Sequence, residues 1–147
     1  MKEAATIKDL LSYRVHRLAN ALSRGAASRY RREFGVSLME WRTIALLGGF
    51  APMALKDLAK QSGLDKGQAS RTVSGLVARG FVLREAGRGD AREITLRLSP
   101  AGVDLHQGLM AAARARDAAF MAALPPEERA LLEDAIARLT EVARKQA

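Results

Sequence analysis

The chain of 147 residues contains no cysteine. Disulfide bonds, thiolate catalysis and thiol-based redox sensing are therefore excluded. Histidine is also scarce, since His16 and His106 are the two copies. A zinc site needs several nitrogen or sulfur ligands, so we expect neither a metal nor another cofactor.

Long hydrophobic runs are missing as well. The longest uncharged run, residues 43–55, is too short to span a bilayer and contains Pro52. The N-terminus carries Glu3 and Asp9 and lacks the apolar segment of a signal peptide. We therefore expect a soluble, cytoplasmic protein.

The charge that is present is mostly positive. Lysine and arginine number 24 against 16 acids, which gives a formal net charge of +8. Residues 54–100 hold nine basic residues against five acids, and residues 1–33 hold eight against three, whereas residues 127–147 hold four against five. This distribution fits a polyanionic partner, although a modest positive balance is also common in proteins that bind nothing acidic.

The periodicity predicts a mainly α (α+β) protein of one domain, residues 1–147. We expect one long helix over residues 5–33, broken at Gly35. A second should start at the capping box Ser37–Glu40 and end at Gly48-Gly49. Later helices should run from Pro100 to about residue 123 and over residues 127–145, with Pro125 and Pro126 between them.

Residues 55–80 have the pattern of a helix-turn-helix. The first helix, residues 55–63, has apolar residues at helical spacing and ends at Gly63. The second, residues 65–79, opens with a weak capping box from Asp65 to Gln68 and ends at Gly80. Its non-apolar face suits the major groove of DNA; that face carries Lys66, Gln68, Ser70, Arg71 and Ser74.

A basic hairpin should follow this second helix. Residues 81–85 and the alternating residues 94–98 predict two strands, joined by the glycine-bearing loop 86–93. A helix-turn-helix with such a hairpin is a winged helix. Arg88 or Arg92 could then enter a minor groove, where negative potential attracts arginine. The alternative is a solvated hairpin tip that is basic by chance.

These motifs together resemble the MarR family of bacterial transcriptional regulators. The most specific segments are residues 64–73, Asp90–Arg92 and the exit of residues 96–102, Leu-Arg-Leu-Ser-Pro-Ala-Gly. The resemblance implies a homodimer that binds a pseudo-palindromic operator in double-stranded DNA, often as a repressor. It also implies that Gln68, Ser70 and Arg71 meet base edges, that Lys66 and Ser74 lie nearer phosphates, and that Asp90 orients Arg92. One departure is the presence of Gly67 and Gly75 in the recognition helix, where glycine costs stability.

The domain plan that follows is a winged-helix core at residues 36–100 between dimerisation helices at residues 5–34 and 100–146. Both terminal helices carry apolar stripes that a small winged helix cannot cover, and a second copy would cover them. Packing of the two terminal helices on each other within one chain is the alternative.

Members of this family often bind small aromatic acids or phenols, which weaken DNA binding. Tyr13 and His16 on the first helix, with Trp41 and Arg42 on the second, could supply an aromatic wall and a cation. The simpler interpretation places Trp41 in the core and the other two in an interface.

The sequence disfavours two other classes of function. An enzyme is disfavoured, because Gly87-Arg-Gly89 does not continue into a dinucleotide-binding fingerprint and no nucleophile set is evident. A winged helix that only binds proteins should present an apolar or acidic recognition face, which the basic helix at residues 65–79 does not.

Overall fold

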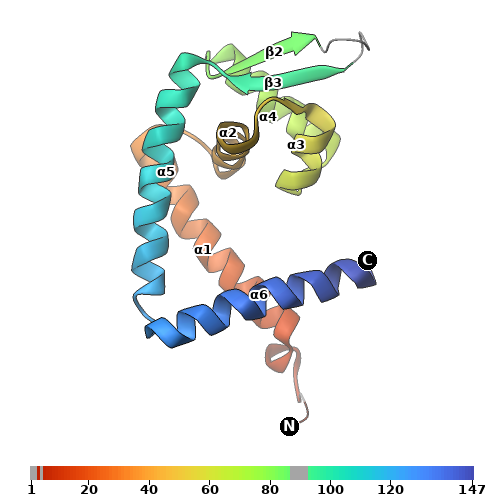
Figure 1. The fold of residues 1–147 in the computed structure, drawn as a ribbon, viewed down its shortest axis with the longest axis vertical. Coiled ribbons are helices and arrows are strands. Elements are labelled where there is room, and N and C mark those ends of the chain that lie inside the picture. Colours follow the sequence, from red (N-terminus) through yellow and green to blue (C-terminus); the bar gives the residue numbers. More distant parts are fainter. Residues whose placement is uncertain (1–2, 4, 87–92) are drawn as a thin grey trace. The chain divides into compact units, whose positions relative to one another are not determined.

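The computed structural model describes residues 3, 5–86 and 93–147. It contains six α-helices within these residues, and a three-stranded sheet (Figure 1). The elements in chain order are a 3-10 turn Ile7–Asp9, α1 Leu11–Phe34, α2 Leu38–Phe50, β1 Met53–Ala54, α3 Leu55–Ser62, α4 Lys66–Ala78, β2 Val82–Ala86, β3 Ile94–Leu98, α5 Pro100–Met121 and α6 Pro126–Gln146. By packing, the chain divides into two compact units, Met1–Leu109 and Met110–Ala147.

The N-terminal helix is shorter than the sequence predicts. The expected single helix from residue 5 is wrong, because Leu10 is extended and separates the 3-10 turn from α1. The Asp9 carboxylate accepts hydrogen bonds from the backbone N–H and the hydroxyl of Thr6, at 2.9 and 3.1 Å. This local cap closes a separate turn before α1 begins.

The helix ends predicted at Gly35, Gly63 and Gly80 are confirmed, but the end predicted for α2 at Gly48 and Gly49 is wrong, because this helix continues to Phe50. Gly35, Gly63 and Gly80 all have positive φ values, between 65° and 81°, a conformation that favours glycine. In α2, Ser37 Oγ accepts from the Glu40 N–H while Glu40 Oε1 accepts from the Ser37 N–H. Local chain chemistry therefore fixes where these helices begin and end.

The sheet has one more strand than the predicted hairpin. β3 lies in the middle, antiparallel to β2 on one side and to the two-residue β1 on the other. Met53 pairs with Leu96 across β1 and β3, and Val82 pairs with Leu98 across β2 and β3. Because Met53, Val82, Leu96 and Leu98 are buried, this register turns one face of the sheet into the core.

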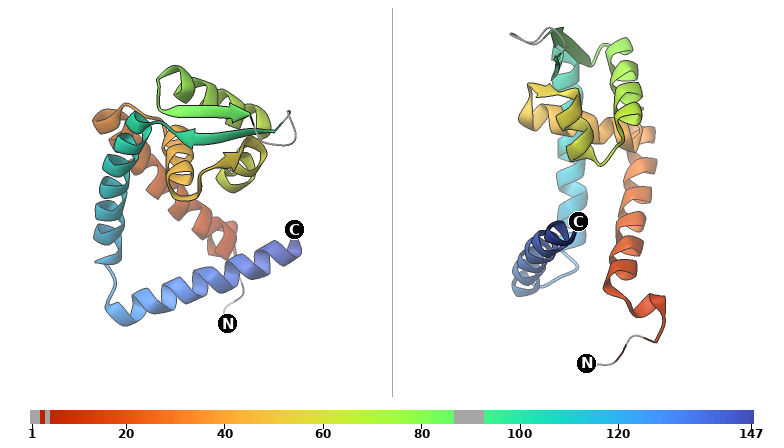
Figure 2. Two further views of the ribbon diagram at one scale, coloured as in Figure 1. Left: turned by 45° about the horizontal axis from the view of Figure 1, so that its top comes forward. Right: turned by 90° about the vertical axis from the view of Figure 1, so that its right-hand side faces the viewer.

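The core of the first unit lies between this sheet and α2, α3 and α4. Figure 1 and Figure 2 show the three helices gathered on one face of the hairpin. The helices contribute apolar side chains that are almost fully buried, namely Ile44, Leu47, Leu58, Ala69, Val73 and Leu76. Burial of a valine, leucine or isoleucine side chain stabilises by about 1.5–3 kcal/mol, so Val73 and Leu76 anchor α4 by its apolar side.

The start of α5 is joined tightly to the end of α4. Ser99 Oγ donates to the Gly80 carbonyl at 2.5 Å and accepts from the Gly102 N–H at 3.0 Å, while the Ser99 N–H bonds the Phe81 carbonyl. A Cβ on Gly102 would overlap the Phe81 carbonyl oxygen. Glycine at position 102 is therefore what allows α5 to start this close to β2.

The second unit consists of the end of α5 and all of α6. Arg129 Nε donates to the Leu124 carbonyl at 2.8 Å, which closes the turn between the two helices. α6 carries acids in its first turn and Arg144 and Lys145 in its last, as its dipole favours. One side of α6 is an exposed apolar row, formed by Leu131, Leu132, Ile136, Leu139 and Val142. Within the described part of the chain, no helix is long and apolar enough to cross a membrane.

Candidate nucleic-acid interface

The recognition helix α4 begins with the capping box that the sequence predicts. Asp65 Oδ1 accepts from the Gln68 N–H at 2.8 Å, and Gln68 Oε1 accepts from the Asp65 N–H at 3.3 Å. The Gln68 side chain, predicted as a base reader, thus also caps its own helix. Its amide nitrogen is left to donate to a partner.

The two sides of α4 differ as expected. Ala69, Val73 and Leu76 are buried, whereas Lys66, Arg71 and Ser74 are exposed and Ser70 is half-buried. A rigid helix therefore presents two cations and two hydroxyls to solvent. These groups can donate to phosphates and to guanine edges.

Arg71 lies in a row with two glycines, one turn before it and one turn after it. A Cβ on Gly67 would lie 3.3 Å from Arg71 Nη1 and 3.3 Å from Asp65 Oδ1, so the guanidinium rests over the start of the helix. A Cβ on Gly75 would meet no other described atom within 4 Å. The chain's own packing therefore does not require glycine at position 75.

The hairpin contributes a cation that sequence reasoning missed. Arg84 Nη2 donates to Ser74 Oγ at 2.6 Å, which links β2 to the exposed side of α4. The register explains this contact, because Arg84 pairs with buried Leu96 and so projects toward the helix side of the sheet. Because side chains alternate along a strand, the place of Arg84 two residues after Val82 could have indicated its direction, but not its partner.

The predicted wing residues Arg88, Asp90 and Arg92 lie outside the described residues. In the hairpin that leads to them, Arg97 Nε of β3 pairs with Glu85 Oε1 of β2 at 2.6 Å. Lys56 Nζ of α3 approaches Oε1 of Glu93, just before β3, at 4.0 Å.

A second cation that the sequence did not single out lies at the end of α4. Arg79 pairs with Glu40 at 3.0 Å and donates to the Gly35 carbonyl at 3.0 Å. Both acceptors lie about forty residues earlier in the chain, so no local pattern reveals the contact.

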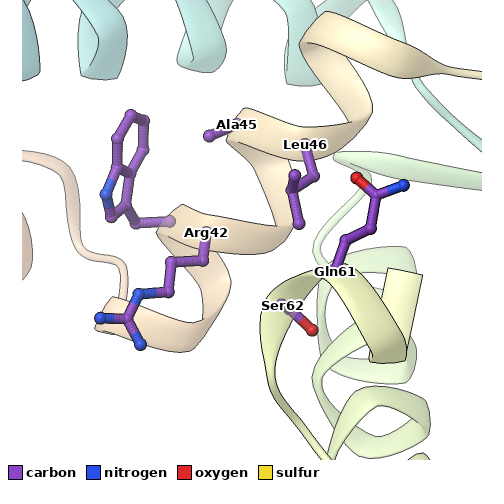
Figure 3. Close-up of a pocket in the computed structure, with 6 residues that line it drawn as sticks. Arg42, Ala45, Leu46, Gln61 and Ser62 are labelled. Carbon is purple, nitrogen blue, oxygen red and sulfur yellow. The ribbon is translucent and has the colours of Figure 1, made fainter. Parts of the chain in front are cut away.

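A pocket of about 300 Å³ opens between α2 and α3. Figure 3 shows Leu46 of α2 pointing toward Gln61 of α3, with Arg42 farther along α2 and Ser62 beside Gln61. The complete lining is Trp41, Arg42, Ala45, Leu46, Gln61 and Ser62. An apolar wall with a guanidinium, an amide and a hydroxyl suits a small anion with an apolar body.

The structure brings together half of the predicted effector residues. Trp41 and Arg42 line the pocket, and both also reach α1: the Trp41 ring lies 5.2 Å from Tyr30, and Arg42 Nη2 lies 3.4 Å from Ser23 Oγ. Tyr13 and His16 lie in the first half of α1 and are not part of this lining. The side chain of His16 instead contacts Asn20 at 3.0 Å.

The N-terminal half of α1 and the preceding turn carry an apolar row that the first unit leaves uncovered. Ile7, Leu11, Val15 and Leu18 are each more than half exposed. Exposed apolar rows of this length mark interaction surfaces more often than free protein surface.

A helix-turn-helix with a basic recognition side and an adjoining β-hairpin defines a winged helix-turn-helix protein. Residues 34–93 match the family model described as the MarR family, and the fold matches solved MarR-family regulators along nearly the whole chain. The winged-helix part of the chain therefore resembles the MarR family.

Three solved structures illustrate the similarity. The MarR family transcriptional regulator SPO1453 from Silicibacter pomeroyi DSS-3 is 28% identical with a TM-score of 0.83, and the match covers 95% of this chain and 99% of that chain. MepR of S. aureus, solved as a complex with DNA, is 15% identical with a TM-score of 0.80, over 90% and 98%. NadR, solved with 4-hydroxyphenylacetate, is 23% identical with a TM-score of 0.77, over 95% of each chain. No curated protein matches the sequence.

Proposed function

We propose that this protein is a dimeric, sequence-specific DNA-binding transcriptional regulator, acting as a repressor. The observation that carries the proposal is the exposed side of α4, where Lys66, Arg71 and Ser74 stand clear of the core and Arg84 reaches Ser74 from the hairpin. The DNA complex of the similarly folded MepR supports duplex DNA as the partner.

In this proposal α4 enters the major groove. Gln68, Ser70 and Arg71 then meet base edges, and Lys66 and Ser74 lie nearer phosphates. Residues 86–93 form the wing, and Arg88 and Arg92 reach the minor groove with Asp90 orienting Arg92. The hydrogen bond from Arg84 to Ser74 adds a further cation between helix and wing.

A titration against duplex DNA tests this function. A random duplex should bind more weakly as salt rises, because each phosphate contact contributes about 0.9 to the slope of log affinity against log salt. A duplex selected by the protein from a randomised pool, and the DNA upstream of its own gene, should bind more tightly. A winged helix that binds only proteins would show no salt-dependent DNA binding at all.

The dimer is proposed from the two uncovered apolar rows. The row of residues 7–18 is flanked by Arg14 and Arg17, whereas the row of α6 has both acids and bases beside it, with Asp134 paired to Arg138. A second copy could cover both apolar rows. Two recognition helices would then read a pseudo-palindromic operator.

The effector is proposed to be a small aromatic acid that binds between α2 and α3 and releases DNA. Arg42 would pair with the carboxylate and Trp41 would contact the ring. Gln61 and Ser62 are the last residues of α3, so a bound molecule would touch the helix that leads into α4. The complex of NadR with 4-hydroxyphenylacetate supports this chemical class.

We use 4-hydroxyphenylacetate as the probe for the effector site. It should raise the melting temperature of the protein, and Arg42→Ala should remove that increase because the carboxylate loses its cation. The variant Arg29→Ala also removes one arginine of α1–α2 but leaves the pocket intact, so it should keep the shift.

The affinity of the probe in the presence of DNA is a second measurement for this site, because the two binding events must affect each other equally. A coupling of about 1–3 kcal/mol would change DNA affinity roughly 5- to 150-fold, and DNA must weaken binding of the probe by the same factor. Equal binding of the probe in the presence and absence of DNA would contradict a role in release.

A further inference from the structure

Arg79 joins three helices at one corner of the first unit. It is the C-terminal cap of α4, and its guanidinium makes contacts in three directions. Nη1 pairs with Glu40 Oε2 at 3.0 Å, Nη2 donates to the Gly35 carbonyl at 3.0 Å, and the central carbon lies 5.2 Å from the Phe81 ring. The planar guanidinium of arginine has N–H donors on two terminal nitrogens, so it can contact both acceptors at once. A lysine ammonium cannot reproduce this geometry.

Gly35 and Glu40, the two acceptors of Arg79, are held in place by hydrogen bonds of their own. Gly35 is the left-handed cap of α1, and its N–H bonds the last turn of that helix. Glu40 uses its other oxygen, Oε1, to accept from the Ser37 N–H at 2.9 Å. Val36, between them, is fully buried. The corner is therefore rigid on the side that receives the guanidinium.

The contact also fixes the recognition helix against the helix that bears the apolar row. α1 spans 24 residues, so it is roughly 36 Å long at 1.5 Å per residue. A rotation of about 5° at one end of a rod of that length moves the other end by about 3 Å. That displacement is close to the spacing of roughly 3.4 Å between successive base pairs.

From this geometry we propose that Arg79 is a positioning residue that sets which half-site spacing the protein accepts. The proposal rests on the proposed dimeric reading of DNA. In the dimer, the far ends of the two α1 helices lie at the subunit contact, and each Arg79 holds its recognition helix at a fixed angle to α1. Loss of this contact frees that angle without removing a group that touches DNA.

The test measures affinity as a function of spacing. A duplex with paired half-sites is selected by the wild-type protein, and variants of it are made with one or two base pairs inserted or deleted between the half-sites. The wild type should lose about tenfold or more in affinity for each base pair of displacement. Arg79→Ala should bind the displaced duplexes within about threefold of the best one.

Two further variants keep the test valid if Arg79→Ala fails to fold. Glu40→Gln preserves the capping hydrogen bond, because glutamine serves equally at that position, but it removes the charge that faces Arg79. Arg79→Lys keeps the positive charge without the fork. Both should broaden the accepted spacing less than Arg79→Ala. The matched control is Arg29→Ala, which removes an arginine of similar exposure whose partner, Glu33, lies on the same helix.

The outcomes separate the two proposals. A sharp spacing optimum that survives in Arg79→Ala, or an equal loss of affinity at every spacing, would overturn the positioning role and leave the DNA-binding function standing. A selected pool without paired half-sites would instead contradict dimeric reading, and with it the role of Arg79. If Arg29→Ala also binds the displaced duplexes nearly as well as the best one, the loss of a positive charge would explain the effect. The contacts of Arg79 would then not be its cause.

Discussion

We propose that base reading by α4 depends most on Arg71. It is exposed and is flanked along its row by Gly67 and Gly75, so the guanidinium can move along the helix without meeting another side chain in that row. In the free protein its guanidinium lies over Gly67. We expect DNA binding to draw it outward toward a base.

Arg71→Ala should weaken binding to the selected duplex far more than binding to a random duplex. A bidentate contact between arginine and guanine supplies about 1–3 kcal/mol of discrimination, so the ratio of the two affinities should fall about tenfold. Lys66→Ala is the comparison: it should weaken both duplexes alike and lower the salt slope by about 0.9. Equal losses on both duplexes for Arg71→Ala would assign Arg71 to phosphate.

Contacts that the sequence predicted differ from those it did not predict in how far apart the two partners lie along the chain. Asp65 with Gln68 and Ser37 with Glu40 are three residues apart, so their capping bonds follow from local spacing. Arg84 reaches a partner ten residues away, and Arg79 reaches partners 39 and 44 residues away. Contacts of that range depend on strand register and helix packing, which no short pattern encodes.

At the scale of elements, the helices were predictable and the edges of the sheet were not. Periodicity and caps locate α2 to α6 because each helix carries its own signal. The strand β1 has two residues, too few for any alternation to be seen. It forms because buried Met53 falls opposite Leu96 once α2 and α3 are packed. The early break at Leu10 was missed because the apolar spacing continues through it.

The junction of α4, β2 and α5 gives a prediction about stability. Gly102→Ala should lower the free energy of unfolding by about 1–3 kcal/mol, because the new Cβ overlaps the Phe81 carbonyl and the backbone must shift. Gly75→Ala is the matched change, since its Cβ meets no described atom within 4 Å. It should raise helix stability by up to about 1 kcal/mol. Chemical denaturation of both variants measures the difference, and a neutral Gly102→Ala would contradict the tight junction.

At the scale of the whole molecule, assembly should depend on the apolar row of α6. Leu139 is 48% exposed in the single chain, so Leu139→Asp should leave the fold of one copy unchanged. It should nevertheless separate the dimer, because a charge would be buried in the contact. Light scattering should report a monomer, and affinity for paired half-sites should fall to that for one half-site. The control is Glu141→Ala, on the exposed polar side of α6, which should leave the dimer intact. If Leu139→Asp remains a dimer, the subunit contact does not involve this row.

The uncovered apolar row of α6 makes the fraction of dimer, and with it DNA binding, depend on the concentration of this protein. If two copies must meet before two half-sites are held, then at low abundance the dimer grows with the square of the chain concentration. Halving the dose of the gene would then lower operator occupancy about fourfold rather than twofold. A cell that dilutes the regulator by growth would therefore release its target genes abruptly.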